Sequence, residues 1–302
     1  MTTAFVLSGG GSLGAVQVGM LQALAARRIE PDLLVGTSAG ALNAAFIGSH
    51  GMTDASLSEL ATIWTDLRRG DVFPLHLARL TAATLGLAPS LCPNDGLRRL
   101  VDRHLACDRL EDARVPVHVV ATDVRSGKEV VLSEGDAVEA VLASAAVPAV
   151  LPPVHVAGRD LIDGGVADNS AISHAFGLGA DVIYVLPTGY ACALERAPRS
   201  ILGNALQALT LLIEQRLILE VAHYAERADI RVLPPLCPLT VSSADFRHGA
   251  LLIDRAQIAT GRWLDAGRHH LPHPERFLSL HDHPPLTHVA SDGDVLLRAE
   301  AS

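Results

Sequence analysis

Short apolar runs recur along the chain and alternate with longer segments of helical periodicity. The strongest runs are apolar at every position, which is typical of strands buried on both faces of a parallel sheet. Together with weaker runs they predict strands over Ala4–Leu7, Leu33–Val35, Val115–Thr122, Glu129–Leu132, Val154–Val156, Leu161–Ile162, Ala180–Leu186 and Ile230–Leu233. The segments between them predict helices over Ala15–Ala26, Gly40–Gly48, Leu57–Leu67, Leu97–Leu105, Ala137–Ala146, Ile201–Arg227 (as one helix or two) and Ala250–Ala266. This alternation predicts an α/β three-layer sandwich, in which a mostly parallel central sheet carries helices on both faces.

No linker or internal repeat divides the chain, so residues 1–268 are expected to form one domain. Residues 269–302 are rich in His, Pro and Asp, and we expect a poorly ordered tail there. The stretch Val72–Leu91 is apolar but lacks a clear period and contains Pro74 and Pro89. We favour core packing for this stretch over a role as a lid or as the rim of an apolar binding pocket, and the second interpretation stays open.

Charge and cysteine content narrow the class of protein. The net charge of −9 argues against a nucleic-acid binder and against strong electrostatic attachment to anionic membranes, while leaving apolar insertion into lipid open. The four cysteines lack metal-ligand or redox spacing, and we expect reduced thiols. Neither a signal peptide nor a transmembrane helix is predicted, so we expect a cytoplasmic protein that can lie peripherally on a membrane.

The segment Gly36-Thr37-Ser38-Ala39-Gly40 has the form Gly-x-Ser-x-Gly and stands between a predicted strand and a predicted helix. This is the context of a nucleophile elbow, in which a sharp turn exposes a serine hydroxyl. Small residues at Gly36 and Gly40 let the two backbones approach each other closely. The partial positive charge at the helix N-terminus favours a developing anion. Ser38 is therefore a candidate nucleophile.

A glycine-rich loop, Gly9-Gly10-Gly11-Ser12-Leu13-Gly14, follows the first strand and opens a helix. It matches the dinucleotide fingerprint Gly-x-Gly-x-x-Gly, but the second strand ends in Ser38 and lacks the acid that would bind a ribose. A tight strand-to-helix turn is the plain structural explanation. With the elbow one strand later, an oxyanion hole is favoured, with Gly10 and Gly11 as the amide donors.

A serine nucleophile needs a base. The chain has 14 histidines, including His155, His174 and His223, but none stands in a motif. A stronger candidate is Asp163, which ends an apolar run and is followed by two glycines. The glycines would allow a substrate or another backbone to approach the carboxylate closely, although Asp-Gly is also an ordinary hairpin turn.

These three segments together resemble the patatin-like phospholipase family, in which a glycine-rich loop, Gly-x-Ser-x-Gly and Asp-Gly-Gly follow in this order. The resemblance extends over about residues 4–266 and includes Ala121-Thr122-Asp123, Ala143-Ser144 through Pro148 to Pro152-Pro153, and Ser243-Ala244-Asp245-Phe246. The chain departs from the family at Leu13, where the loop usually has Arg or Lys, and at Ala171, where a Pro is common. The first departure leaves the loop to be held by packing.

The resemblance implies a patatin-like fold and a serine acyl hydrolase with a Ser38–Asp163 dyad, acting on fatty-acyl esters of lipids or phospholipids. It implies no metal and no cofactor. An aspartate of ordinary pKa is a poor base, so partial desolvation of Asp163 is expected. The partner would be a lipid substrate at a membrane surface, while oligomeric state and head group are left unspecified.

Two other functions stay open at this point. One is a nucleotide-binding oxidoreductase that uses the Gly9–Gly14 loop, against which the missing ribose acid counts. The other is a catalytically degenerate lipid-binding protein, against which the intact Ser38 and Asp163 count.

Overall fold

The computed structural model describes residues 1–74, 77–194, 197–198, 201–271, 274 and 278. Most of the predicted tail, 269–302, lies outside these residues. Each predicted strand is present within two residues of its expected bounds, and each predicted helix within three. The sequence pattern missed only short helices.

The described part of the chain forms one eight-stranded sheet with the order β5-β6-β3-β2-β1-β7-β8, and β4 pairs with β3. The parallel strands are β1 (Thr3–Leu7), β2 (Leu33–Thr37), β3 (Val117–Asp123), β7 (Val182–Leu186) and β8 (Asp229–Val232). The antiparallel pairings involve β4 (Glu129–Leu132), β5 (Val154–Val156) and β6 (Arg159–Asp163). The sheet is therefore mostly parallel, as predicted.

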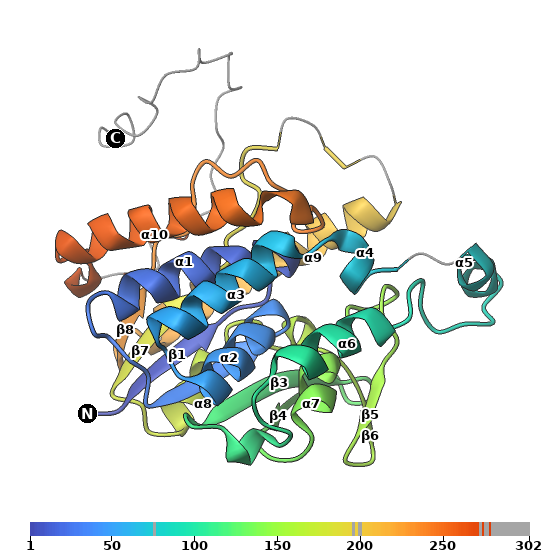
Figure 1. The fold of residues 1–302 in the computed structure, drawn as a ribbon, viewed down its shortest axis with the longest axis horizontal. Helices are drawn as coiled ribbons and strands as arrows, with labels where there is room; N and C mark the ends of the chain where they lie inside the picture. Colours follow the sequence, from blue (N-terminus) through green and yellow to red (C-terminus); the bar gives the residue numbers. More distant parts are fainter. Residues whose placement is uncertain (75–76, 195–196, 199–200, 272–273, 275–277, 279–302) are drawn as a thin grey trace, which may run out of the picture.

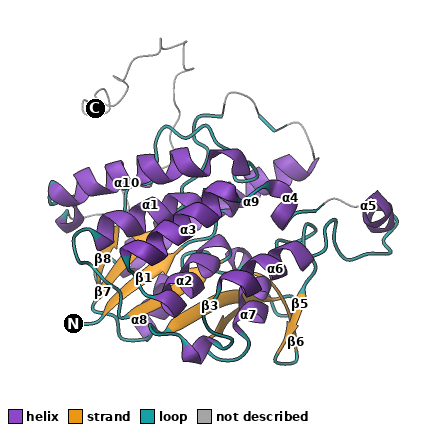
Figure 2. Cartoon of the chain, in the orientation of Figure 1, coloured by secondary structure: helices purple, strands orange, loops and turns teal. Residues whose placement is uncertain are grey.

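Helices cover both faces of this sheet (Figures 1 and 2). The larger core packs beneath α1 (Gly14–Ala25), α2 (Ala39–His50), α3 (Asp54–Asp66), α6 (Asp95–His104), α7 (Ala137–Ser144) and α10 (Gly249–Asp265). The smaller core lies under α8 (Ile172–Gly177) and α9 (Ile201–Tyr224). The segment Ile201–Arg227, expected to form one helix or two, contains the single helix α9. Alternate residues of β1 serve the two cores, with Phe5 in the first and Val6 in the second, because successive strand side chains point to opposite faces. The three-layer α/β sandwich is confirmed.

The registers around β3 place two strand ends against each other. Ala121 pairs with Val130 of β4 and also with Asp163 of β6, so β4 and β6 lie on opposite edges of β3. β2 and β4 also lie on opposite edges of β3, because Val119 and Val120 of β3 pair with both of these strands. Hence β2 and β6 share one edge of β3 and meet head-on. Their last residues, Thr37 and Asp163, pair with the consecutive residues 120 and 121.

Two short helices follow α3. The first, α4 (Arg69–Val72), ends where the stretch without a clear period begins, and the second, α5 (Leu77–Thr84), lies within that stretch. In Figure 1, α5 stands away from the rest of the chain. All four cysteines are free thiols, as predicted. Among the described helices, none combines the length and apolarity needed to cross a bilayer.

Candidate active site

Ser38 occupies a strained turn between β2 and α2. Its backbone has φ 54° and ψ −121°, a conformation that costs a non-glycine residue about 1–3 kcal/mol. A Cβ at Gly36 would lie 2.6 Å from the Gly40 carbonyl oxygen, and one at Gly40 would clash with the carbonyl of Leu7. Both positions therefore need glycine for the close approach predicted at the elbow.

Ser38 and Asp163 are in direct contact. Ser38 Oγ donates a 2.7 Å hydrogen bond to Oδ2 of Asp163, and the Gly165 N–H donates a 2.8 Å bond to Oδ1. Both residues are buried, with 7% and 6% of their surface exposed. The first hydrogen bond is the arrangement through which a carboxylate can take a hydroxyl proton.

Burial changes the acid-base behaviour of this aspartate. Loss of hydration raises the pKa of Asp163 from its ordinary value of 3.8 to about 6, although hydrogen bonds from Ser38 and Gly165 act in the opposite direction. The carboxylate is still ionised at neutral pH, and it is a stronger base than an exposed one. This is the partial desolvation expected from the sequence.

Ser144, at the end of α7, fixes the backbone of the elbow. Its Oγ accepts a 2.8 Å hydrogen bond from the Ser38 N–H and donates a 2.5 Å bond to the carbonyl of Val120 on β3. The strained turn is thus tied to the central strand through one buried hydroxyl. The sequence placed Ser144 in a family segment but gave no sign of this role.

The glycine-rich loop closes over the same site. Asn169 Oδ1 accepts a 3.0 Å bond from the Gly9 N–H, and Thr188 Oγ1 donates 2.8 Å to the Gly9 carbonyl. The N–H groups of Gly10 and Gly11 have no hydrogen-bond acceptor among the residues that the structure describes. Both glycines line the cavity that contains Ser38 and Asp163. This position favours the oxyanion-hole interpretation over the dinucleotide one.

Two residues of the loop explain how it is held without a basic side chain. Leu13 is completely buried in the larger core. The Ser12 N–H donates a 2.8 Å bond to the carbonyl of Ser243, close to the segment before α10. Packing and main-chain bonds therefore support the loop, as expected from the Leu13 departure.

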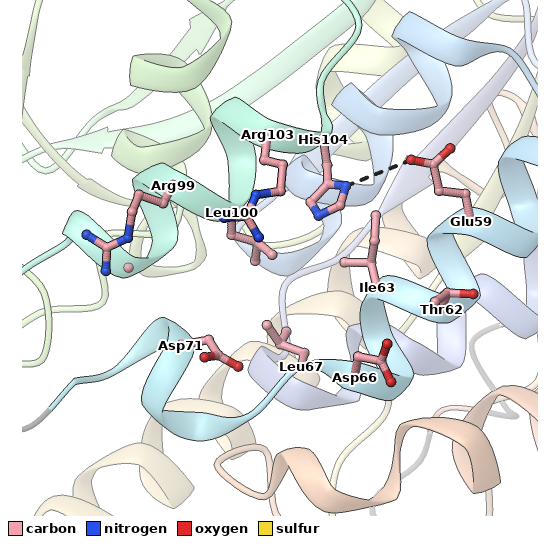
Figure 3. A pocket seen from close by; sticks show the side chains of 11 residues that line it. Glu59, Thr62, Ile63, Asp66, Leu67, Asp71, Arg99, Leu100, Arg103 and His104 are labelled. Atoms are coloured by element: carbon pink, nitrogen blue, oxygen red, sulfur yellow. Dashed lines mark ion pairs between the residues drawn. The ribbon is translucent and has the colours of Figure 1, made fainter.

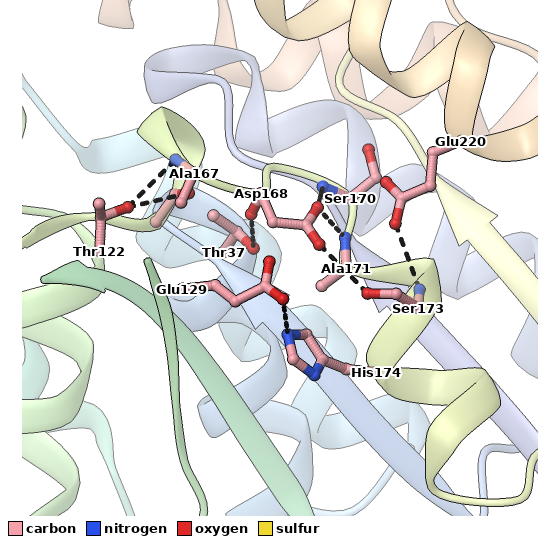
Figure 4. Close-up of polar contacts among 11 residues, drawn as sticks. Thr37, Thr122, Glu129, Ala167, Asp168, Ser170, Ala171, Ser173, His174 and Glu220 are labelled. Atoms are coloured by element: carbon pink, nitrogen blue, oxygen red, sulfur yellow. Dashed lines mark hydrogen bonds and ion pairs between the residues drawn. The ribbon is translucent and has the colours of Figure 1, made fainter. Parts of the chain in front are cut away.

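Asp168 organises the segment after Asp163 (Figure 4). Its Oδ1 accepts hydrogen bonds from the N–H groups of Ser170 and Ala171, and its carbonyl lies 3.4 Å from Thr37 Oγ1. Ala171 adopts φ 44°, outside the range that a proline ring allows, so the departure from Pro matches the backbone found here. Because Asn169 stands between these bonded residues, Asp168 sets its position against the glycine-rich loop.

Two cavities meet at Ser38. The first, of about 110 Å³, contains the dyad and the glycine-rich loop, and Arg69 is the cation in its lining. The Arg69 guanidinium makes no ion pair or hydrogen bond with any described residue. The second, of about 60 Å³, has an almost wholly apolar lining from Leu42, Trp64, Leu97 and their neighbours. The site therefore combines an apolar chamber, the hydrogen-bonded pair of Ser38 and Asp163, and a cation.

A separate groove of about 430 Å³ with a mixed polar and apolar lining runs between α3 and α6 (Figure 3). It displays Glu59, Asp66, Arg99 and Arg103 to solvent and contains neither Ser38 nor Asp163. Its floor includes Leu67 and Leu100, which also line the apolar cavity. The groove is the outer side of that cavity wall.

The histidines considered from the sequence lie elsewhere. His155 pairs with Asp160 at 2.9 Å and His174 with Glu129 at 3.6 Å, and neither they nor His223 line the two described cavities at Ser38. The sequence reasoning missed Ser144, Asn169 and Arg69. Asn169 follows the Asp-Gly-Gly segment closely, which is a local signal that could have singled it out.

Comparison with known proteins decides the family. The family model described as Patatin-like phospholipase matches residues 5–176, which is more than half of the chain. The chain belongs to the patatin-like phospholipase family. The matched range contains the glycine-rich loop, the elbow and Asp163 of this patatin-like chain.

Relatives in this family include Lysophospholipase nte1 of Aspergillus terreus, 28% identical over 191 residues, and its counterpart in Aspergillus oryzae, 30% identical over 187 residues. Each match covers 61% of this chain but only 12% of the fungal protein, so the patatin-like chain corresponds to a small part of these relatives. Among solved structures, VipD from Legionella pneumophila matches at 17% identity with a TM-score of 0.47, covering 88% of this chain and 67% of VipD.

Proposed function

We propose that this patatin-like chain is a serine acyl hydrolase that cleaves fatty-acyl esters of phospholipids. Ser38 is the nucleophile, Asp163 the general base, and the N–H groups of Gly10 and Gly11 form the oxyanion hole. The observation that carries the proposal is the 2.7 Å hydrogen bond between the buried Ser38 hydroxyl and Asp163.

The reaction follows from this geometry in two steps. Asp163 takes the proton as Ser38 Oγ attacks the ester carbonyl, and the Gly10 and Gly11 amides stabilise the oxyanion, each donor contributing about 3–4 kcal/mol. Collapse of the tetrahedral intermediate breaks the bond to the alcohol, which leaves with the proton from Asp163. The same carboxylate then takes a proton from water, which attacks the acyl-serine. As the fatty acid leaves, Asp163 returns this proton to the Ser38 oxygen and the site is restored.

The two cavities suit different parts of a phospholipid substrate. The apolar cavity suits the acyl chain, because its lining offers hydrocarbon contact and excludes water. Arg69 in the other cavity suits the phosphate of the leaving group, since an otherwise unpaired guanidinium binds phosphate oxygens well. A phospholipid or lysophospholipid places these two chemistries on opposite sides of an ester.

The test is a substrate panel assayed with the parent protein and with the Ser38→Ala and Asp163→Asn variants. We expect hydrolysis of phospholipid esters by the parent and a loss of about 10³-fold or more in both variants. A fluorophosphonate ester should label the parent and leave Ser38→Ala unlabelled, because only an activated serine reacts. Parent protein that is neither labelled nor active on any ester would support a catalytically degenerate lipid-binding protein instead.

A further inference from the structure

Three leucines on and after α5 are largely exposed. Leu77 is 80%, Leu85 68% and Leu87 78% exposed. We define α5 and the turn after it, residues 77–87, as the docking lobe. Figure 1 shows α5 projecting from the body of the molecule. The expectation of core packing for Val72–Leu91 is therefore wrong for these side chains, because a helix with so few neighbours cannot bury them.

The docking lobe is joined on both sides to the walls of the catalytic cavity. Phe73 lines that cavity before the lobe, and Leu91 and Cys92 line it after the lobe. The return to the body is fixed by 2.8 Å main-chain bonds from the N–H groups of Leu91 and Cys92 to the carbonyls of Ala149 and Val150. A surface that held the lobe would therefore lie close to the cavity that contains Ser38.

The local charge differs in sign from that of the whole chain. Between residues 68 and 92 the sequence has Arg68, Arg69 and Arg79 against the single acid Asp71, a net charge of +2 in a chain of net charge −9. Arg79 is held by a 2.8 Å hydrogen bond to Ser90 Oγ at the base of the lobe. Exposed leucines in a locally cationic segment are the composition that binds an anionic lipid surface, by apolar insertion and by attraction of the head groups.

We propose that the docking lobe inserts Leu77, Leu85 and Leu87 into the surface of an anionic bilayer and so holds the catalytic cavity against its substrate. The biological role of this docking rests on the proposed lipid hydrolysis. The binding itself needs no turnover, so the two can be tested apart.

The binding experiment uses the full chain with Ser38→Ala, which removes hydrolysis. Co-sedimentation is measured with vesicles of phosphatidylcholine and phosphatidylglycerol, and with vesicles of phosphatidylcholine alone. We expect tighter binding to the anionic vesicles, weakened by salt, and at least about a tenfold loss of affinity in the variant Leu77→Ser, Leu85→Ser, Leu87→Ser. The matched control is Leu178→Ser, Leu251→Ser, Ile258→Ser, which changes exposed apolar residues outside the lobe and should bind like the parent.

A second measurement separates docking from catalysis. With Ser38 intact, the lobe variant should hydrolyse a water-soluble short-chain ester at the parent rate and lose activity only on vesicles.

The proposal would be overturned if the parent did not bind vesicles, or if the parent and the lobe variant bound them equally well. A parent dimer that becomes a monomer in the lobe variant would also overturn it, because the leucines would then cover a second copy. Retained esterase activity in Ser38→Ala would refute the proposed function while leaving the docking result intact.

Discussion

Ser38 and Asp163 are 125 positions apart in the chain, yet Ser38 Oγ lies 2.7 Å from Oδ2 of Asp163. The contact exists because β2 and β6 end head-on along the same edge of β3. Ser38 is the first residue after β2, and Asp163 is the last residue of β6. The hydrogen bonds of the sheet therefore set the positions of both residues.

The pH dependence of the reaction should follow Asp163. Its pKa is raised to about 6 by burial, and the protonated carboxyl cannot accept the Ser38 proton. We expect kcat/KM for a soluble ester to be constant above this pH and to fall about tenfold per pH unit below it. A profile that stays flat well below pH 6 would assign the base to another group.

Removing the Asp163 charge should stabilise the fold. A carboxyl whose pKa is higher in the folded state contributes stability when protonated and loses it as the pH rises from about 3.8 through about 6. At neutral pH, the free energy of unfolding of Asp163→Asn should therefore exceed that of the parent by up to about 3 kcal/mol. The difference should disappear at low pH, where both side chains are neutral. Urea unfolding across this range checks it, and a variant less stable than the parent at neutral pH would contradict it.

Ser144→Ala should damage the elbow. The Ser38 N–H and the Val120 carbonyl would both lose a buried partner, which costs about 1–3 kcal/mol of unfolding free energy. We expect a lower kcat with little change in KM, since the nucleophile loses its fixed position. The control is Ser49→Ala, a buried serine bonded to the Phe46 carbonyl, which should reduce stability and leave kcat unchanged. Equal effects of the two variants on kcat would rule out this positioning role.

Gly10→Ala should impair the oxyanion hole. A Cβ at Gly10 would clash with the side chain of Thr188, so the loop must move away from the oxyanion. We expect kcat to fall by about 10²–10³-fold. Gly177→Ala at the end of α8 is the matched control, because nothing lies within 4 Å of the added Cβ. Steady-state kinetics of both variants test this, and a Gly10→Ala protein of parental kcat would remove Gly10 from the mechanism.

Arg69→Gln should change substrate preference. We expect a loss of about tenfold or more in kcat/KM for a lysophospholipid, because a charge-assisted hydrogen bond to phosphate is lost. Hydrolysis of a neutral ester should be unaffected. The exposed Arg262 on α10 provides the control Arg262→Gln, which should leave both rates unchanged. A proportional loss on both substrates in Arg69→Gln would argue against phosphate recognition.

The sequence by itself determined the elements and the local chemistry. Apolar runs located the strands, because a strand buried on both faces needs them, and the glycines at positions 36 and 40 located the elbow, because only glycine allows the backbones so close. Asp163 could be singled out because its motif is also local.

Only the tertiary structure decided that Ser38 and Asp163 meet and what holds them in place. Strand pairing depends on which edge of β3 each strand occupies, and no local pattern encodes that choice. The same holds for Ser144 and Asn169, whose hydrogen-bond partners at the site lie far away in the chain. It also holds for Arg69, which the fold brings into the lining of the cavity that contains Ser38 and Asp163. The raised pKa of Asp163 is likewise a property of the layers packed around it, because desolvation depends on everything that excludes water from the site.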